Sequence, residues 1–166
     1  DDVCPAGNPR PQGEPAGASR PFDSRRSGLV PGEGAGVMLL EAREHAESRG
    51  ARILGRIAGY ASRFEPPASA WAKRSGRAVV QSITAALASA DLPPEDIGHV
   101  NAHGESTVEQ DRLEAAAIRE TLGDVPVTAP KSYFGDLAAG SGAVELIASV
   151  LALEHNKIPP TLNYEQ

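Results

Sequence analysis

The stretch KSYFGDLAAGSGAVE, residues 131–145, leads from a polar turn into a helix of small residues. The apolar run VPVTAP stands immediately before it and predicts a strand, whereas SGAVELIASVLALEHNK predicts a helix. Lys131, Ser132 and Asp136 therefore lie where a strand ends and a helix begins. Because a helix N-terminus presents free N–H groups and a positive potential, this turn suits an anionic group such as a phosphate, carboxylate or enolate.

A second turn, NAHGEST at residues 101–107, belongs to the end of the strand-like run IGHVNAH at residues 97–103. Its His103 precedes Gly104, and a neutral imidazole can act near pH 7 as a general base or as a hydrogen-bond donor to a carbonyl oxygen. The same histidine can instead satisfy a backbone carbonyl at the strand end. Both turns place titratable groups and a glycine between a strand and a helix, so they can line one pocket.

Strands and helices alternate along the chain, which predicts an α/β layered fold with its site at the ends of strands. One helix starts at Thr107, with Gln110 at the capping-box spacing, and ends at Gly123. The run PGEGAG, residues 31–36, lacks the lysine and hydroxyl residue of a phosphate loop and predicts a tight turn where backbones approach closely. The remaining expected elements are strands at residues 34–42 and 52–64, a short helix that ends at Gly50, and helices at residues 68–90 and 141–157.

Composition and charge narrow the classes of function. A chain of 166 residues, 40% of them hydrophobic, can form one domain with a sizeable core. The formal charge is −6 and basic residues are scattered, so we expect no nucleic-acid partner. No run approaches the roughly 18 apolar residues of a membrane span, and the polar, proline-rich start lacks the apolar core of a signal peptide. We therefore expect a cytoplasmic protein without membrane contact.

Single residue types exclude some kinds of site. Cys4 is the one cysteine, so no internal disulfide can form, and its setting in the loop or linker expected at residues 1–20 favours a surface thiol over a nucleophile. No two histidines or cysteines are spaced as a metal pair, so we expect neither a metal nor another cofactor. Asp111 and Glu114 share one helix face, where such a pair can do acid/base work but is more often solvated or salt-bridged.

These motifs, taken in order, resemble the C-terminal half of a β-ketoacyl-[acyl-carrier-protein] synthase (3-oxoacyl-ACP synthase), a thiolase-like condensing enzyme of fatty-acid and polyketide synthesis. VNAHGEST is similar to the family's His-Gly-Thr-x-Thr motif, KSYFGD to its Lys-Ser-x-x-Gly-His motif, and IPPTLNYEQ to its Pro-Pro-Thr-x-Asn stretch. The segment SRPFDSRRSGLVPGEGAGVMLLEAREHAESRGARI, residues 19–53, is similar to the one that follows the family's nucleophile domain. The resemblance runs from about Ser19 to the last residue.

The resemblance implies a layered α/β/α/β/α architecture of two related halves that usually dimerises, with residues 21–166 as a domain that supplies mainly the C-terminal half. We therefore expect apolar surface to remain exposed where an N-terminal half or a second subunit packs. The implied partners are acyl-carrier-protein thioesters. In the family's reaction a cysteine takes the acyl chain, malonyl thioester loses carbon dioxide, and the resulting carbanion attacks the acyl group. That cysteine belongs to the N-terminal half, so this chain by itself is not expected to complete the reaction.

The resemblance also implies roles for single residues. His103 would be the first catalytic histidine, which assists decarboxylation of malonyl carrier protein and steadies the enolate oxygen. Lys131 would be the motif lysine, with Glu145 as its charge partner, and a structural role is implied for the two acidic residues after the histidine motif. The supporting positions carried over from the family are Glu145, Ser132, Gly104, Asp111 and Glu114.

Two departures from the motifs bear on activity. Asp136 occupies the place of the family's second histidine, which donates a hydrogen bond to a developing oxyanion. An ionised carboxylate only accepts, and losing one such donor typically costs about 100- to 1000-fold in rate. Glu105 replaces a threonine and adds negative charge beside His103. Asp136 also suits a cap of the helix that begins near Leu137. Two hypotheses remain: a β-ketoacyl synthase with weakened or altered condensation, and a non-catalytic partner like the chain-length-factor subunits of active ketosynthases.

Overall fold

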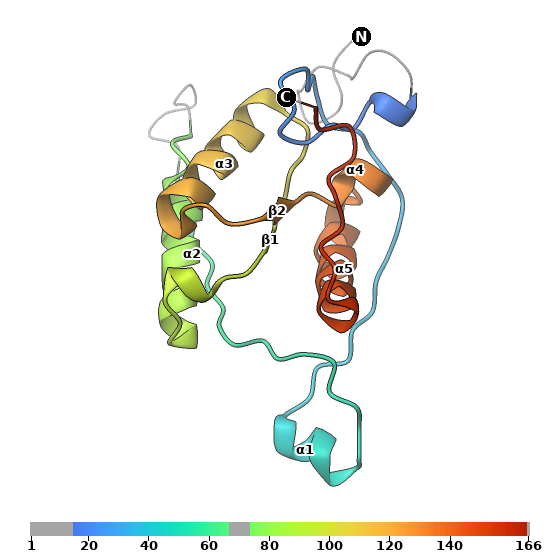
Figure 1. Cartoon of the computed structure of the whole chain (residues 1–166), viewed down its shortest axis with the longest axis vertical. Helices are drawn as coiled ribbons and strands as arrows, with labels where there is room; N and C mark the ends of the chain where they lie inside the picture. Colours follow the sequence, from blue (N-terminus) through green and yellow to red (C-terminus); the bar gives the residue numbers. More distant parts are fainter. Residues whose placement is uncertain (1–14, 67–73, 166) are drawn as a thin grey trace.

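The computed structural model describes residues 15–66 and 74–165. In chain order the elements are η1 (Pro15–Gly17), α1 (Arg43–Ser48), α2 (Arg77–Ala90), η2 (Pro94–Asp96), β1 (Val100–Asn101), α3 (Val108–Leu122), β2 (Val127–Thr128), α4 (Lys131–Phe134), η3 (Ala138–Gly140) and α5 (Ser141–His155). Figure 1 shows the two strands between α2 and α3 on one side and α5 on the other, with α1 apart at the far end. Cys4 and most of the loop or linker expected at residues 1–20 lie outside the described residues.

The two strands run parallel, with Val100 opposite Val127 and Asn101 opposite Thr128. The amide of Ala102 extends this ladder with a 2.8 Å hydrogen bond to the carbonyl of Thr128. These are the strands that the sequence predicts before its two polar turns, although each is only two residues long. Because parallel strands end at the same edge of a sheet, the two turns come together there.

Local signals set most of the helix boundaries. α3 begins after Thr107 and ends at Gly123, as predicted, but the Thr107 hydroxyl makes no capping hydrogen bond. α2 begins after Gly76, whose φ of +80° is left-handed. The helix predicted over residues 68–90 is therefore wrong at residues 74–76, and residues 67–73 lie outside the described part. Among the described residues, no helix is both long and apolar enough to cross a bilayer. α2 packs on α3, and the buried hydrophobic side chains are Ala46, Ala102, Leu113, Ala117, Ile118, Ala129 and Leu137.

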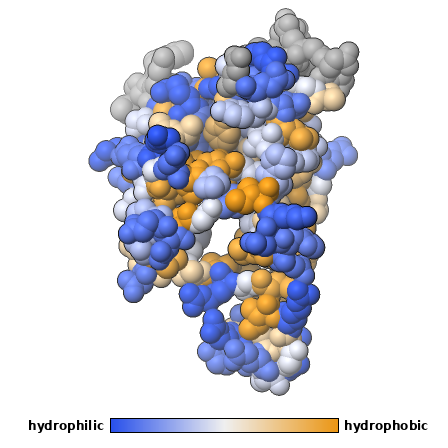
Figure 2. All heavy atoms as spheres, in the orientation of Figure 1, coloured by the Kyte–Doolittle hydropathy of each residue, from blue (hydrophilic) through white to orange (hydrophobic). Residues whose placement is uncertain are grey.

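The strands expected at residues 34–42 and 52–64 are wrong. Neither run contains a strand, and its apolar side chains face solvent, as Val37 (93% exposed) and Tyr60 (76%) illustrate. A strand needs a neighbour to pair its backbone groups, and the described residues supply no such neighbour along either run. Figure 2 shows hydrophobic residues around the opening in the middle of the view and on the limb that carries α1. We call residues 34–42 and 52–64 the exposed apolar runs. Their exposed large side chains are Val37, Leu39, Leu40, Ile53, Leu54, Ile57, Tyr60 and Phe64.

The glycine-rich run at residues 31–36 packs backbone to backbone against the turn that contains Asp136. The amide of Asp136 donates to the carbonyl of Val30 at 2.7 Å, and the amide of Gly32 donates to the carbonyl of Asp136 at 2.8 Å. A Cβ on Gly32 would lie 1.9 Å from the carbonyl oxygen of Phe134, so no side chain fits there. The predicted close approach of backbones is confirmed, but residues 32–36 form no turn.

Candidate functional site

Lys131 is the centre of a buried polar cluster at the shared end of β1 and β2. Its side chain is 1% exposed, and Nζ lies 2.9 Å from the carbonyl oxygen of His103 and 3.0 Å from Nδ1 of the same residue. Nζ also forms a short ion pair with Oε1 of Glu145, which projects from α5. Lys131, His103 and Glu145 form what we call the Lys131 cluster. The structure thus brings together one residue from each predicted turn and the proposed charge partner.

The contacts of Lys131 determine which nitrogen of the neutral His103 ring carries the hydrogen. An ammonium group only donates, so Nδ1 accepts and Nε2 bears the N–H. Nε2 lies 2.9 Å from Oε1 of Glu105 and donates to it. The hydrogen bond to Glu105 raises the pKa of His103 above its ordinary value, although burial and the charge of Lys131 oppose the rise. The His103 side chain is 53% exposed, so a ligand that displaces Glu105 can reach Nε2.

Glu114 holds the backbone of the turn at His103. Its Oε1 accepts the amide of His103 at 2.7 Å, and its Oε2 accepts the amide of Gly104 at 2.9 Å. Gly104 has a φ of +48°, and a Cβ there would lie 2.6 Å from Cβ of the fully buried Ala129. Glycine at this position therefore lets the turn pack closely against the end of the second strand.

Asn101 ties the cluster to α5, a role that the motifs at the two turns do not predict. Its Nδ2 donates to the carbonyl of Glu145 at 2.7 Å and to Oγ of Ser149 at 2.8 Å. Because Asn101 belongs to β1, these bonds set the position of the ion-pair partner relative to the strand. An amide side chain just before the predicted strand end was the available signal, but nothing local points to a partner 44 residues further on.

Asp136 lies in the turn after α4, where its carboxylate is already used. Oδ1 accepts the amide of Ala138 at 3.0 Å and the hydroxyl of Ser141 at 2.7 Å. Both donors stand at the start of the helical segment that leads into α5, so the carboxylate closes an Asx-type turn just before it. Asp136 is not the predicted cap itself, because the N-cap residues of η3 and α5 are Leu137 and Gly140. Within the described residues, no hydrogen bond or ion pair joins Asp136 to the Lys131 cluster.

Ser132 and Asp111 lie outside the Lys131 cluster and bind backbone groups. Oγ of Ser132 donates to the carbonyl of Ala129 at 2.8 Å and accepts the amide of Leu162 at 3.0 Å. Oδ2 of Asp111 accepts the amide of Phe22 at 2.8 Å, and burial raises the pKa of this carboxyl. These contacts connect distant parts of the chain and suit structural residues.

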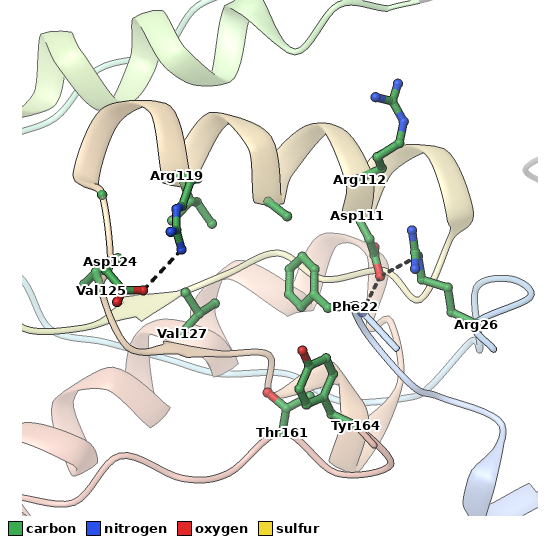
Figure 3. Close-up of a pocket in the computed structure, with 13 residues that line it drawn as sticks. Phe22, Arg26, Asp111, Arg112, Arg119, Asp124, Val125, Val127, Thr161 and Tyr164 are labelled. Atoms are coloured by element: carbon green, nitrogen blue, oxygen red, sulfur yellow. Dashed lines mark hydrogen bonds and ion pairs between the residues drawn. The ribbon is translucent and has the colours of Figure 1, made fainter. Parts of the chain in front are cut away.

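Two cavities flank α3 on different faces. His103 lines one of about 400 Å³, together with Arg63, Phe64, Glu65, Arg74, Leu113 and Glu114 among others. The second, of about 580 Å³, is shown in Figure 3, where Phe22 lies beside Asp111 and the pair formed by Arg119 and Asp124 lies at the other end, beyond Val127. The larger cavity contains no residue of the Lys131 cluster, so the candidate chemistry lies beside the smaller one. Across residues 15–66 and 74–165, no three side chains are grouped to hold a metal ion.

Residues 54–165 match the family model described as "Beta-ketoacyl synthase, C-terminal domain". The chain belongs to the β-ketoacyl synthase family. This ketosynthase chain is 44% identical to the granaticin polyketide putative β-ketoacyl synthase 1 of Streptomyces violaceoruber, over 98% of the chain and 39% of the relative. It is 41% identical to 3-oxoacyl-[acyl-carrier-protein] synthase 2 of Synechocystis sp., over 92% of the chain and 38% of the relative. It therefore spans about two-fifths of the length of these curated relatives.

Solved ketosynthases share the fold of this chain. One is a type II polyketide acyl-carrier protein in complex with its ketosynthase bound to the hexaketide, with a TM-score of 0.86 and 32% identity over 100% of this chain and 44% of that one. Another is the ishigamide ketosynthase/chain length factor, with a TM-score of 0.81 and 38% identity over 89% of this chain and 37% of that one. The predicted thiolase-like α/β fold is confirmed, and the described residues form a C-terminal part of it, with helices around a small sheet.

The two departures from the ketosynthase motifs both have partners inside this chain. Glu105 accepts the Nε2–H of His103, and Asp136 accepts from the segment that leads into α5. The one N–H of the neutral His103 ring is therefore engaged within the chain.

Proposed function

We propose that this chain is part of an acyltransferase of polyketide or fatty-acid synthesis, a β-ketoacyl synthase whose decarboxylative condensation is weakened or altered. In this reaction the α-carbon of malonyl-[acyl-carrier protein] bonds to the carbonyl carbon of an acyl thioester, carbon dioxide leaves, and the acyl group departs from the cysteine sulfur that carried it. The Lys131 cluster is the observation that supports the proposal. It orients a histidine N–H at the wall of a cavity.

The proposed roles within the cluster follow from its contacts. His103 is the catalytic residue, since its Nε2–H can donate to the malonyl carbonyl oxygen as that oxygen gains negative charge. Lys131 is a positioning residue, because its 1% exposed side chain acts on substrate through the ring of His103. Glu145 forms an ion pair with Lys131 and so compensates its charge beside the imidazole.

Asp136 explains the weakened condensation in this proposal. Its Oδ1 already accepts two hydrogen bonds, and an ionised carboxylate offers no hydrogen to a developing oxyanion. Loss of one such donor costs about 100- to 1000-fold in rate. We therefore expect measurable but slow product formation.

Intact-mass spectrometry of the carrier proteins tests the proposal. Malonyl and acyl carrier proteins are incubated with the longest natural protein that contains this chain. We expect a slowly accumulating β-ketoacyl carrier protein, which His103→Ala abolishes and His155→Ala, at the exposed end of α5, leaves unchanged. Unchanged masses with a folded protein would contradict the proposal.

A non-catalytic subunit of chain-length-factor type is the second candidate, and the engaged carboxylate of Asp136 favours it. The nucleophile position of the longest natural protein separates the two candidates, since a cysteine there supports the enzyme and any other residue supports the subunit. Asp136→His gives an independent test. A large rise in condensation would identify Asp136 as the defect, whereas no rise would support the subunit.

We also infer that the exposed apolar runs pack against an N-terminal ketosynthase half, in a cytoplasmic homo- or heterodimer that receives acyl-carrier-protein thioesters. Two observations support this inference. Val37 is 93% exposed and Phe64 80% exposed, and the chain covers 39% of the length of its relative in Streptomyces violaceoruber. Light scattering tests this inference. The chain by itself should self-associate through this surface, and a monodisperse monomer would contradict the inference.

A further inference from the structure

Glu105 engages the one ring nitrogen of His103 that a ligand can reach. Nδ1 faces the buried Nζ of Lys131, whereas Nε2 lies 2.9 Å from Oε1 of Glu105. The His103 side chain is 53% exposed and lines the smaller cavity, and the Glu105 side chain is 22% exposed, so a ligand can reach this hydrogen bond. A carbonyl oxygen that is to accept the Nε2–H must therefore take the place of the Glu105 carboxylate.

The other charged groups that contact His103 or its turn already have partners. Lys131 is paired with Glu145, and the carboxylate of Glu114 accepts two backbone amides. Among the described residues, the ion-pair partner of Glu105 is His103 itself. Other charged side chains that line the cavity beside His103 have both signs: Arg63, Glu65 and Arg74.

We propose that Glu105 determines specificity, because its carboxylate beside Nε2 of His103 favours uncharged acyl thioesters over thioesters that carry a carboxylate, such as malonyl. The inference rests on the proposed function and names the substrate class that the same site prefers. A neutral thioester competes with Glu105 only for one hydrogen bond. A malonyl group brings a second negative charge to the same place and is repelled as well.

The expected size of this preference follows from Coulomb's law. We take two like unit charges about 4 to 6 Å apart, with an effective dielectric constant between that of bulk water and that of a protein surface. Their repulsion then lowers the affinity for a malonyl group, relative to an uncharged acyl group, by about tenfold or more. Glu105→Gln removes the charge but keeps an amide oxygen that can accept the Nε2–H. It therefore separates the effect of charge from the effect of the hydrogen bond.

Binding calorimetry on the longest natural protein that contains this chain tests the inference. The probes are amide analogues of acetyl- and malonyl-pantetheine, in which an NH group replaces the thioester sulfur so that no acyl transfer occurs. We expect Glu105→Gln to tighten the malonyl analogue about tenfold relative to the acetyl analogue. The matched control is Glu120→Gln, which removes an exposed charge elsewhere on α3 and should leave the ratio unchanged.

The outcomes separate this inference from the proposed function. An unchanged ratio in Glu105→Gln, with the acetyl analogue still bound, would overturn the inference and leave the proposed function standing. Failure of every variant to bind either analogue, with urea midpoints like that of the natural protein, would overturn the proposed function and the inference with it. Glu105→Thr should match Glu105→Gln in its ratio, since both lack the charge.

Discussion

Replacing Lys131 with methionine tests whether the Lys131 cluster holds the site together. Methionine retains an unbranched apolar stem of similar length but removes Nζ and its charge. Glu145 then loses its cation, and the carbonyl oxygen and Nδ1 of His103 lose a donor. The variant therefore leaves a carboxylate and two acceptors without the partner that the folded chain provides.

The expected magnitude follows from the burial of the two partners. Removing one member of a buried ion pair typically lowers the free energy of unfolding by about 3 to 5 kcal/mol. The Glu145 side chain is 15% exposed, so water can partly solvate the orphaned carboxylate and we expect about 3 kcal/mol. Combining Lys131→Met with Glu145→Leu removes that charge, so the double variant should recover about 1 to 2 kcal/mol relative to Lys131→Met alone.

Urea unfolding followed by circular dichroism measures these differences in the longest natural protein that contains the chain. Lys157→Met is the matched control, because Lys157 is exposed and its replacement should change stability by no more than about 0.5 kcal/mol. A loss below about 1 kcal/mol for Lys131→Met would refute the reasoning. Strict additivity of the two substitutions would refute it as well, since residues that form an ion pair must be coupled.

Three further predictions concern single positions. Gly104→Ala should lower the free energy of unfolding by about 1 to 3 kcal/mol, because the new Cβ would lie 2.6 Å from Cβ of Ala129. Gly98→Ala is the control in the same urea experiment, because a Cβ at Gly98 meets no atom within 4 Å. Asp136→Asn should barely change the free energy of unfolding, whereas Asp136→Ala should lower it by about 1 kcal/mol, since only asparagine keeps an oxygen that can accept the hydrogen bonds of Ala138 and Ser141. Equal losses in thermal melts would argue against these two bonds. Glu105→Gln should lower the pKa of His103 in an NMR titration, because the carboxylate is the main cause of its rise. The raised pKa stabilises the fold below the ordinary value of about 6.5, and this contribution fades as pH rises through the folded pKa, so Glu105→Gln should flatten that part of the stability profile.

The elements around the site were predictable where the signal is local. A glycine stops α3 at Gly123, and short apolar runs mark β1 and β2. The parallel pairing of two such strands places His103 and Lys131 at one edge, as the alternating pattern indicates. The segment at residues 34–42 has the same apolar character but forms no strand, because a strand depends on a neighbouring strand that the local sequence does not specify.

By itself, the sequence determined the family of this protein, the identity of its central strands and helices, and the residue types at both polar turns, because these depend on short-range composition and on motifs. Tertiary structure alone decided which partners those residues have. The Nζ of Lys131 reaches a histidine 28 residues away and a glutamate 14 residues away on α5. The hydrogen bond between Glu105 and His103 likewise depends on a ring orientation set by Lys131. Such contacts form only when separate segments pack together, so the pattern of any one segment cannot encode them.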